Sequence, residues 1–238
     1  MRDYRFPYKD AGFILNNLID FDQICADMGL EEVNGELATA ILEEAGRLGG
    51  DVLAPLNAVA DELGATLEDD GVHETPGFAD IYRQYVDNGW ASLCGDEKYG
   101  GQGMPRVLNA AVVEIWDSAC VSFSLCPLLT TGAIESIHAH GSDELKDTYL
   151  PNMVAGEWTG TMCLTEPAAG SDLAAVAAKA VPEGDHYLLT GQKIYITWGD
   201  HDATDNIVHL VLAKLPDAPE GSRGISLFLV PKYLVNAD

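Results

Sequence analysis

Apolar side chains recur at helical spacing through the first two thirds of the chain. Between Gly35 and Leu63 they return every three or four residues, which is the pattern of an amphipathic helix that buries one face. Gly49-Gly50 and Pro55 interrupt this run, and glycine pairs and prolines bend helices. The pattern therefore predicts a long, bent helical region over residues 35–63.

Further helices are predicted between this region and Gly156. One begins near Pro76, two cover residues 107–121 and 127–140, and the last begins at a Ser142 cap and ends at Leu150-Pro151. A serine at this position can accept a hydrogen bond from a free amide of the first turn. We therefore expect an all-helical domain at residues 35–156, preceded by an N-terminal segment of residues 1–34.

After Gly156 the apolar period changes from helical to alternating. The expected strands are Thr161–Leu164, His186–Thr190, Lys193–Thr197, Asn206–Leu215 and Ile225–Val230. Gly191-Gln192 is expected to join the second and third of these as a tight hairpin. Helices followed by strands predict an α+β fold, with an antiparallel β-domain at residues 157–238.

The stretch from residue 160 to residue 200 carries the candidate chemistry. Gly170 has no Cβ and Ser171 has a hydroxyl donor, so their bend could bind an anion such as a pyrophosphate. Thr165 follows a strand and could direct its hydroxyl at a ring heteroatom. Tyr195 and Thr197 alternate on the expected hairpin and would form a flat wall with a polar tip. An ordinary hairpin with a small-residue turn and a surface aromatic remains the alternative.

The letters MCLTEPAAGSD, followed by GQKIYIT, resemble the flavin-binding signature of acyl-CoA dehydrogenases. This resemblance implies an FAD cofactor and assigns roles to matching positions. Met162, Leu164 and Thr165 would contact the flavin. Gly170 and Ser171 would meet the pyrophosphate, with Ser171 near the CoA entrance. Tyr195 and Thr197 would cover the isoalloxazine, although the family's usual aromatic is Trp, and here a Trp follows only at position 198.

A glycine-rich loop from Cys94 to Pro105 lacks the Lys-Ser/Thr ending of a nucleotide-binding P-loop. It resembles a loop that shapes the helical domain of the same family near the substrate channel. We interpret it as structural, with Tyr99 as a candidate substrate contact. The N-terminal segment in turn resembles that of a subgroup that includes the 3-(methylthio)propionyl-CoA dehydrogenases.

The resemblance implies α,β-dehydrogenation of an acyl-CoA thioester, with electron-transfer flavoprotein as acceptor and a tetrameric or dimeric assembly. The family's catalytic base is a Glu on a C-terminal helical domain, which we expect to be absent here, so no catalytic residue is assigned. Glu166 is expected to hold its turn, and neither Glu166 nor Glu157 is taken as the base. A non-catalytic subunit that docks onto a complete dehydrogenase, and a flavin monooxygenase on the same fold, remain alternative hypotheses.

Composition excludes several other classes. The net charge of −25 argues against nucleic acid and anionic membrane surfaces as partners. The five cysteines lack C-x-x-C spacing, so neither a disulfide framework nor a zinc site is indicated. His138 and His140 are too close to share a helical face, and we do not take them as metal ligands. We find neither a secretory leader nor an apolar run that would span a bilayer, and we expect a cytoplasmic protein.

Overall fold

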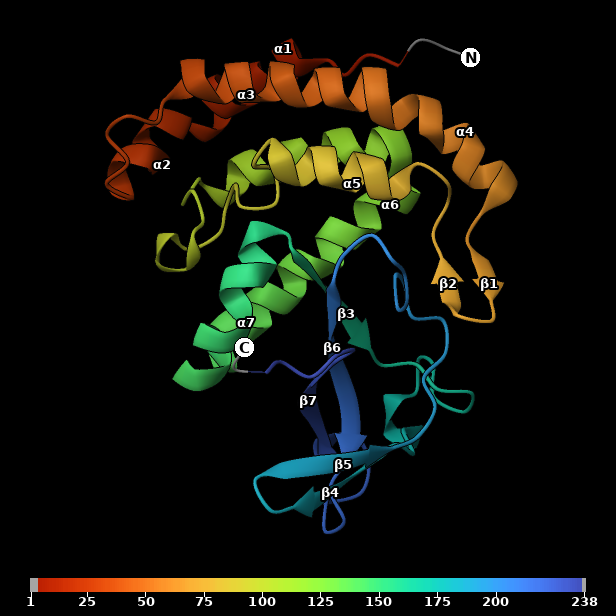
Figure 1. Ribbon diagram of the computed structural model, residues 1–238. Coiled ribbons are helices and arrows are strands. Elements are labelled where there is room, and N and C mark those ends of the chain that lie inside the picture. The colour runs from red at the N-terminus through yellow and green to blue at the C-terminus, as the bar shows by residue number, and fades with distance from the viewer. Residues whose placement is uncertain (1–3, 237–238) are drawn as a thin grey trace.

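The computed structural model describes residues 4–236, with helices at one end of the molecule and a sheet at the other (Figure 1). The α-helices are α1 Tyr8–Ile14, α2 Phe21–Asp27, α3 Gly35–Leu48, α4 Ala54–Leu63, α5 Phe78–Asp87, α6 Arg106–His140 and α7 Asp143–Ala155. Two π-helical segments, η1 Leu15–Ile19 and η2 Gly49–Leu53, join α1 to α2 and α3 to α4. Short 3₁₀ turns occupy Glu97–Tyr99, Leu173–Ala175 and Ser222–Gly224.

The predicted bend in the 35–63 region is confirmed (Figure 1), and two closely packed glycines lie where α3 passes into the π-helical segment. A Cβ on Gly49 would lie 2.7 Å from Cγ2 of Ile115 in α6. A Cβ on Gly50 would lie 2.8 Å from the carbonyl oxygen of Tyr4. The chain therefore passes closer to α6 and to the N-terminal segment than a larger residue would allow, and the helix widens into a π-turn at this point.

The two helices predicted at 107–121 and 127–140 run on as α6, with a kink at Cys120, where φ is −159° and ψ is 88°. Arg106 and Glu135 form an ion pair although they lie at opposite ends of α6, so the two legs of the helix converge. Pro127 lies inside the second leg and does not end it. By length and composition α6 could cross a membrane, but half of its most apolar window is buried inside this structure.

The cap at Ser142 is confirmed, because its hydroxyl accepts a hydrogen bond from the Leu145 amide at 3.3 Å. The predicted end of α7 at Leu150-Pro151 is wrong, since the helix continues to Ala155 and ends at Gly156, whose φ is +84°. Met153 and Val154 are buried beyond the proline. Their packing outweighs the one backbone hydrogen bond that proline removes.

Strands follow α7, and the α+β arrangement is confirmed. They are β3 Trp158–Cys163, β4 Lys179–Glu183, β5 His186–Thr190, β6 Asn206–Lys214 and β7 Ile225–Pro231, in the order β3-β6-β4-β5 with β7 on β6. The sheet is mixed, whereas we expected antiparallel strands, because β6 pairs in parallel with β3 and β4. A separate hairpin, β1 Thr66–Glu68 with β2 Gly71–His73, extends from the helical domain.

The predicted hairpin at Gly191-Gln192 is wrong. β5 pairs instead with β4 through the turn at Gly184-Asp185, and residues 193–197 form no strand. The Ile194 amide donates to the Thr165 carbonyl at 2.9 Å instead of to a ladder in β5, and φ of Tyr195 is +57°. The interpretation that Tyr195 and Thr197 alternate on one strand face is therefore also wrong.

Candidate functional site

Residues 164–171, which we call the TEP turn, leave the end of β3 and reverse direction through a pair of backbone hydrogen bonds. The amides and carbonyls of Glu166 and Ala169 bond to each other, both at 3.0 Å. The Glu166 carboxylate also accepts the amides of Ala177 and Ala178, at 2.7 and 3.1 Å. The expectation that Glu166 holds this turn is confirmed.

Lys193 forms an ion pair with the Glu166 carboxylate. Its Nζ lies 2.8 Å from Oε1 of Glu166, and the two side chains are only 12% and 6% exposed. Burial alone would raise the pKa of Glu166, but the hydrogen bonds from Lys193, Ala177 and Ala178 and the lysine charge together hold that pKa below its usual value. Both oxygens of the Glu166 carboxylate are therefore occupied by structural partners, so the group holds the turn and is not assigned as a general base.

Residues 193–198, which we call the 193–198 segment, lie beside the TEP turn. The Lys193 ammonium donates to the Leu164 carbonyl at 3.0 Å, next to the hydrogen bond from Ile194 to Thr165. Two of the motifs singled out in the sequence are thereby brought together. Thr165 lies half-buried at their junction, while Tyr195 and Thr197 are exposed.

The remaining predicted site residues are distributed along β3 and the TEP turn. Met162 is half-buried in β3 and packs with the cluster shared by α6 and α7, and Leu164 contributes its carbonyl to Lys193. Gly170 and Ser171 are exposed beyond the Glu166–Ala169 pair, and a Cβ on Gly170 would meet no atom within 4 Å. The turn is therefore open to solvent where a ligand is expected.

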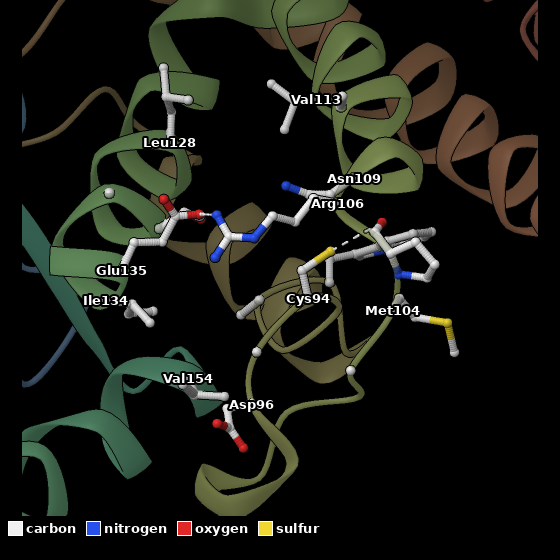
Figure 2. A pocket seen from close by; sticks show the side chains of 18 of the residues that line it. Cys94, Asp96, Met104, Arg106, Asn109, Val113, Leu128, Ile134, Glu135 and Val154 are labelled. Atoms are coloured by element: carbon white, nitrogen blue, oxygen red, sulfur yellow. Dashed lines mark hydrogen bonds and ion pairs between the residues drawn. The ribbon is translucent and has the colours of Figure 1, made fainter. Parts of the chain in front are cut away.

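A pocket of about 1290 Å³ lies in the helical domain between the two legs of α6. Its lining includes Trp90, Cys94, Tyr99, Arg106, Leu128 and Glu135. Figure 2 shows the Arg106 guanidinium reaching across to the Glu135 carboxylate, with Leu128 on the same leg as Glu135. The predicted substrate contact Tyr99 is 7% exposed, and its hydroxyl accepts a hydrogen bond from Lys98 at 2.9 Å.

The glycine-rich loop of residues 94–105 forms one wall of this pocket. The amides of Gln102 and Met104 donate to the carbonyls of Ser92 and Leu93, at 2.9 and 3.0 Å. A Cβ on Gly101 would lie 2.0 Å from the carbonyl carbon and oxygen of Gly95. The glycines thus allow the loop to fold onto itself, which agrees with the structural interpretation of this motif.

Two features were missed by reasoning from the sequence. The sequence predicted two helices in the region of α6, but not that their legs would converge so that Arg106 pairs with Glu135. Trp198 packs into the helical core, with its ring stacked on Phe78 at a centroid distance of 5.7 Å. The only sign of this contact in the sequence was the presence of a second aromatic residue, Trp198, three positions after Tyr195.

Comparisons with known proteins agree with this arrangement. Residues 40–157 match the acyl-CoA dehydrogenase N-terminal domain, and residues 161–236 match the acyl-CoA dehydrogenase middle domain. A solved structure of PigA with FAD and proline covers 82% of this chain and 48% of its own, with a TM-score of 0.64 at 26% sequence identity.

Two curated relatives align along nearly the whole chain. The 3-methylmercaptopropionyl-CoA dehydrogenase of Ruegeria pomeroyi is 49% identical over 97% of this chain and 40% of its own length. A butyryl-CoA dehydrogenase of Syntrophomonas wolfei is 38% identical over 100% of this chain and 39% of its own. The chain thus spans about 40% of the length of these relatives. With two consecutive domains of one family matched along its length, the chain belongs to the acyl-CoA dehydrogenase family.

Proposed function

We propose that this chain provides the FAD-binding face and part of the acyl-CoA site of an acyl-CoA dehydrogenase. The observation that carries the proposal is the junction of the TEP turn with the 193–198 segment, fixed by Lys193 and by the Ile194–Thr165 hydrogen bond. Bound FAD would supply the acceptor for the hydride that leaves the β-carbon of the acyl group. The alignment with PigA holding FAD supports this choice of cofactor.

The exposed groups at this junction fit a flavin dinucleotide. Thr165 and Thr197 offer hydroxyl donors to the ring, and the Tyr195 ring is free to cover an aromatic face. At the other end of the turn, Ser171 offers a hydroxyl beside Gly170, where open space replaces a side chain. Small residues of this kind let backbone amides approach a pyrophosphate closely.

The pocket between the legs of α6 is the proposed site for part of the acyl chain, with Tyr99 in its wall. The names of the two curated relatives favour a short acyl group, including one that carries a methylthio substituent.

None of the described residues is assigned as the catalytic base. As further parts of the proposal, electron-transfer flavoprotein accepts the electrons, the complete enzyme is a homo-oligomer, and it acts in the cytoplasm.

Titration of the purified chain with FAD tests the proposal. Binding should quench flavin fluorescence and shift the visible flavin bands. Ser171→Ala and Thr197→Val should each weaken binding about tenfold, because one hydrogen bond to a charged or polar acceptor contributes on the order of 1.5 kcal/mol. Thr190→Val, on the exposed end of β5, is the matched control and should leave the affinity unchanged.

A chain that leaves free FAD fluorescence unaltered would contradict the cofactor assignment and favour a scaffolding subunit. Equal affinity of the wild type and all three variants would show that FAD binds elsewhere. Reduction of the bound flavin by butyryl-CoA or a methylthiopropionyl-CoA, measured anaerobically in the assembled enzyme, then tests the substrate class.

A further inference from the structure

The 193–198 segment contains two residues in the left-handed region of backbone conformation. φ is +57° at Tyr195 and +52° at Trp198, and residues other than glycine seldom adopt such values. They persist where surrounding contacts determine the conformation. The Tyr195 side chain is 89% exposed, so the contacts that fix this segment come from its ends.

The first end is fixed within the β-domain. Lys193 joins the Glu166 carboxylate and the Leu164 carbonyl, and the Ile194 amide bonds to Thr165. These contacts place the start of the segment against the TEP turn. They precede Tyr195 and leave the conformation of the following residues undetermined.

The second end is fixed to the helical domain through Trp198. Its ring stacks on Phe78, at the start of α5, with the two planes 14° apart. Its Nε1 donates to the Ser122 carbonyl in α6 at 2.9 Å, just beyond the kink at Cys120. Phe78 is 3% exposed and belongs to the main hydrophobic core. Trp198 therefore connects the segment to the buried core of the helical domain.

We propose that Trp198 is a positioning residue that holds Tyr195 and Thr197 in the arrangement required for flavin binding. The inference rests on the proposed function and adds a residue outside the motif that suggested it. With both ends fixed, the residues between them have few alternatives to the left-handed turn. Loss of the Trp198 contacts would let Tyr195 relax to an ordinary conformation and would displace the Thr197 hydroxyl.

Amide hydrogen exchange of the chain without flavin provides the first test. Trp198→Ala should speed exchange at Ile194 and Gly199 at least tenfold, because both amides are hydrogen-bonded within or beside the segment. Trp198→Phe keeps a ring to stack on Phe78 and should restore most of the protection. The control is Tyr187→Ala, which removes a ring that packs on Phe228 in the same domain, at 5.2 Å, away from the segment.

FAD affinity provides the second test. Trp198→Ala should raise the Kd about tenfold and alter the bound flavin spectrum, while Tyr187→Ala should change neither. If the wild type binds no FAD, the proposed function fails, and the exchange measurement still decides whether Trp198 fixes the segment. If the wild type binds FAD and Trp198→Ala binds it with the same Kd and spectrum, the inference fails and the proposed function stands.

If Trp198→Ala does not fold, Phe78→Leu is measured in its place. Phe78→Leu removes the stacking partner from the helical side and leaves the segment's own sequence intact. It should speed exchange at Ile194 and Gly199 more than at the amides of β6. Uniform acceleration across all of these amides would indicate general destabilisation and overturn the positioning role.

Discussion

The Nζ of Lys193 lies 2.8 Å from Oε1 of Glu166, and this pair joins the two sequence motifs on which the proposed cofactor site depends. The same ammonium group also donates to the Leu164 carbonyl at 3.0 Å. One cation therefore satisfies a buried carboxylate and a backbone acceptor at the end of β3. Both motifs keep their relative positions because separating them would leave a buried charge without a partner.

Lys193→Met should therefore lower the free energy of unfolding by about 3 kcal/mol, the cost typical of removing one partner of a buried pair. The Glu166 carboxylate would keep its two amide donors and lose its only cation among the described contacts. Urea unfolding followed by circular dichroism measures the change. Lys179→Met, on an exposed position of β4, is the control, and an equal effect of the two substitutions would contradict this account.

How much of this structure could be predicted from the sequence depends on the range of the interactions involved. Helices such as α3 and α5 follow from a local apolar period and were predicted. The strand predicted at Lys193–Thr197 does not form. Strand pairing is decided by contacts between distant segments, which a local pattern does not reveal. β4 instead pairs with β5 and places Ala180 in a fully buried position.

The candidate site shows the same limit. The sequence motifs predicted Thr165, Ser171 and Thr197 as cofactor contacts, and Glu166 as a structural residue. They gave no indication that Trp198 would pack on Phe78, because that contact depends on how the two domains meet. The pocket between the legs of α6 was missed for a similar reason: two helices were predicted here, but the direction in which the second leg turns back at Cys120 depends on tertiary packing.

The glycine-rich loop offers a prediction on packing. Gly101→Ala should destabilise the protein by about 2 kcal/mol, because the new methyl would collide with the Gly95 backbone and force the loop apart. Gly132→Ala, inside α6 and with open space at its Cβ, should instead stabilise by up to about 1 kcal/mol through helix propensity. Thermal unfolding of the two variants distinguishes the cases, and a stabilising Gly101→Ala would contradict the close approach of Gly101 to Gly95.

Cys94 should react slowly with alkylating reagents. Burial raises the pKa of its thiol to about 11, with only partial compensation from the Arg106 charge. Because the thiolate is the nucleophile, labelling by iodoacetamide should accelerate about tenfold for each pH unit between 7 and 9. Mass spectrometry of the Cys94 peptide measures the rate, and a rate independent of pH would contradict the raised pKa.

His73 should make stability depend on pH between about 6.5 and 9. Its Nε2 lies 3.0 Å from Asp70 and its Nδ1 lies 2.5 Å from Asp202, so the ring joins the β1–β2 hairpin to a loop of the β-domain. Hydrogen bonds to Asp70 and then Asp202 raise the pKa of His73 from its ordinary 6.5 to about 9. Because folding raises the pKa of this imidazole, its protonation stabilises the folded state. The stabilisation is complete at pH values below the pKa in the unfolded chain, and it is lost as the pH rises through the pKa in the folded protein.

Thermal unfolding at closely spaced pH values measures this effect. The melting temperature of the wild type should fall from pH 6.5 to pH 9, and His73→Gln should flatten that part of the curve. His186→Gln is the matched control, because His186 pairs with Asp185, its neighbour in the chain, and joins no second domain. A His73→Gln curve parallel to the wild type would show that the ring is not held as an imidazolium between the two carboxylates. In that case the Val72–Asp200 and Asp202–Glu74 hydrogen bonds would be the contacts that hold the hairpin to the β-domain among those described for residues 4–236.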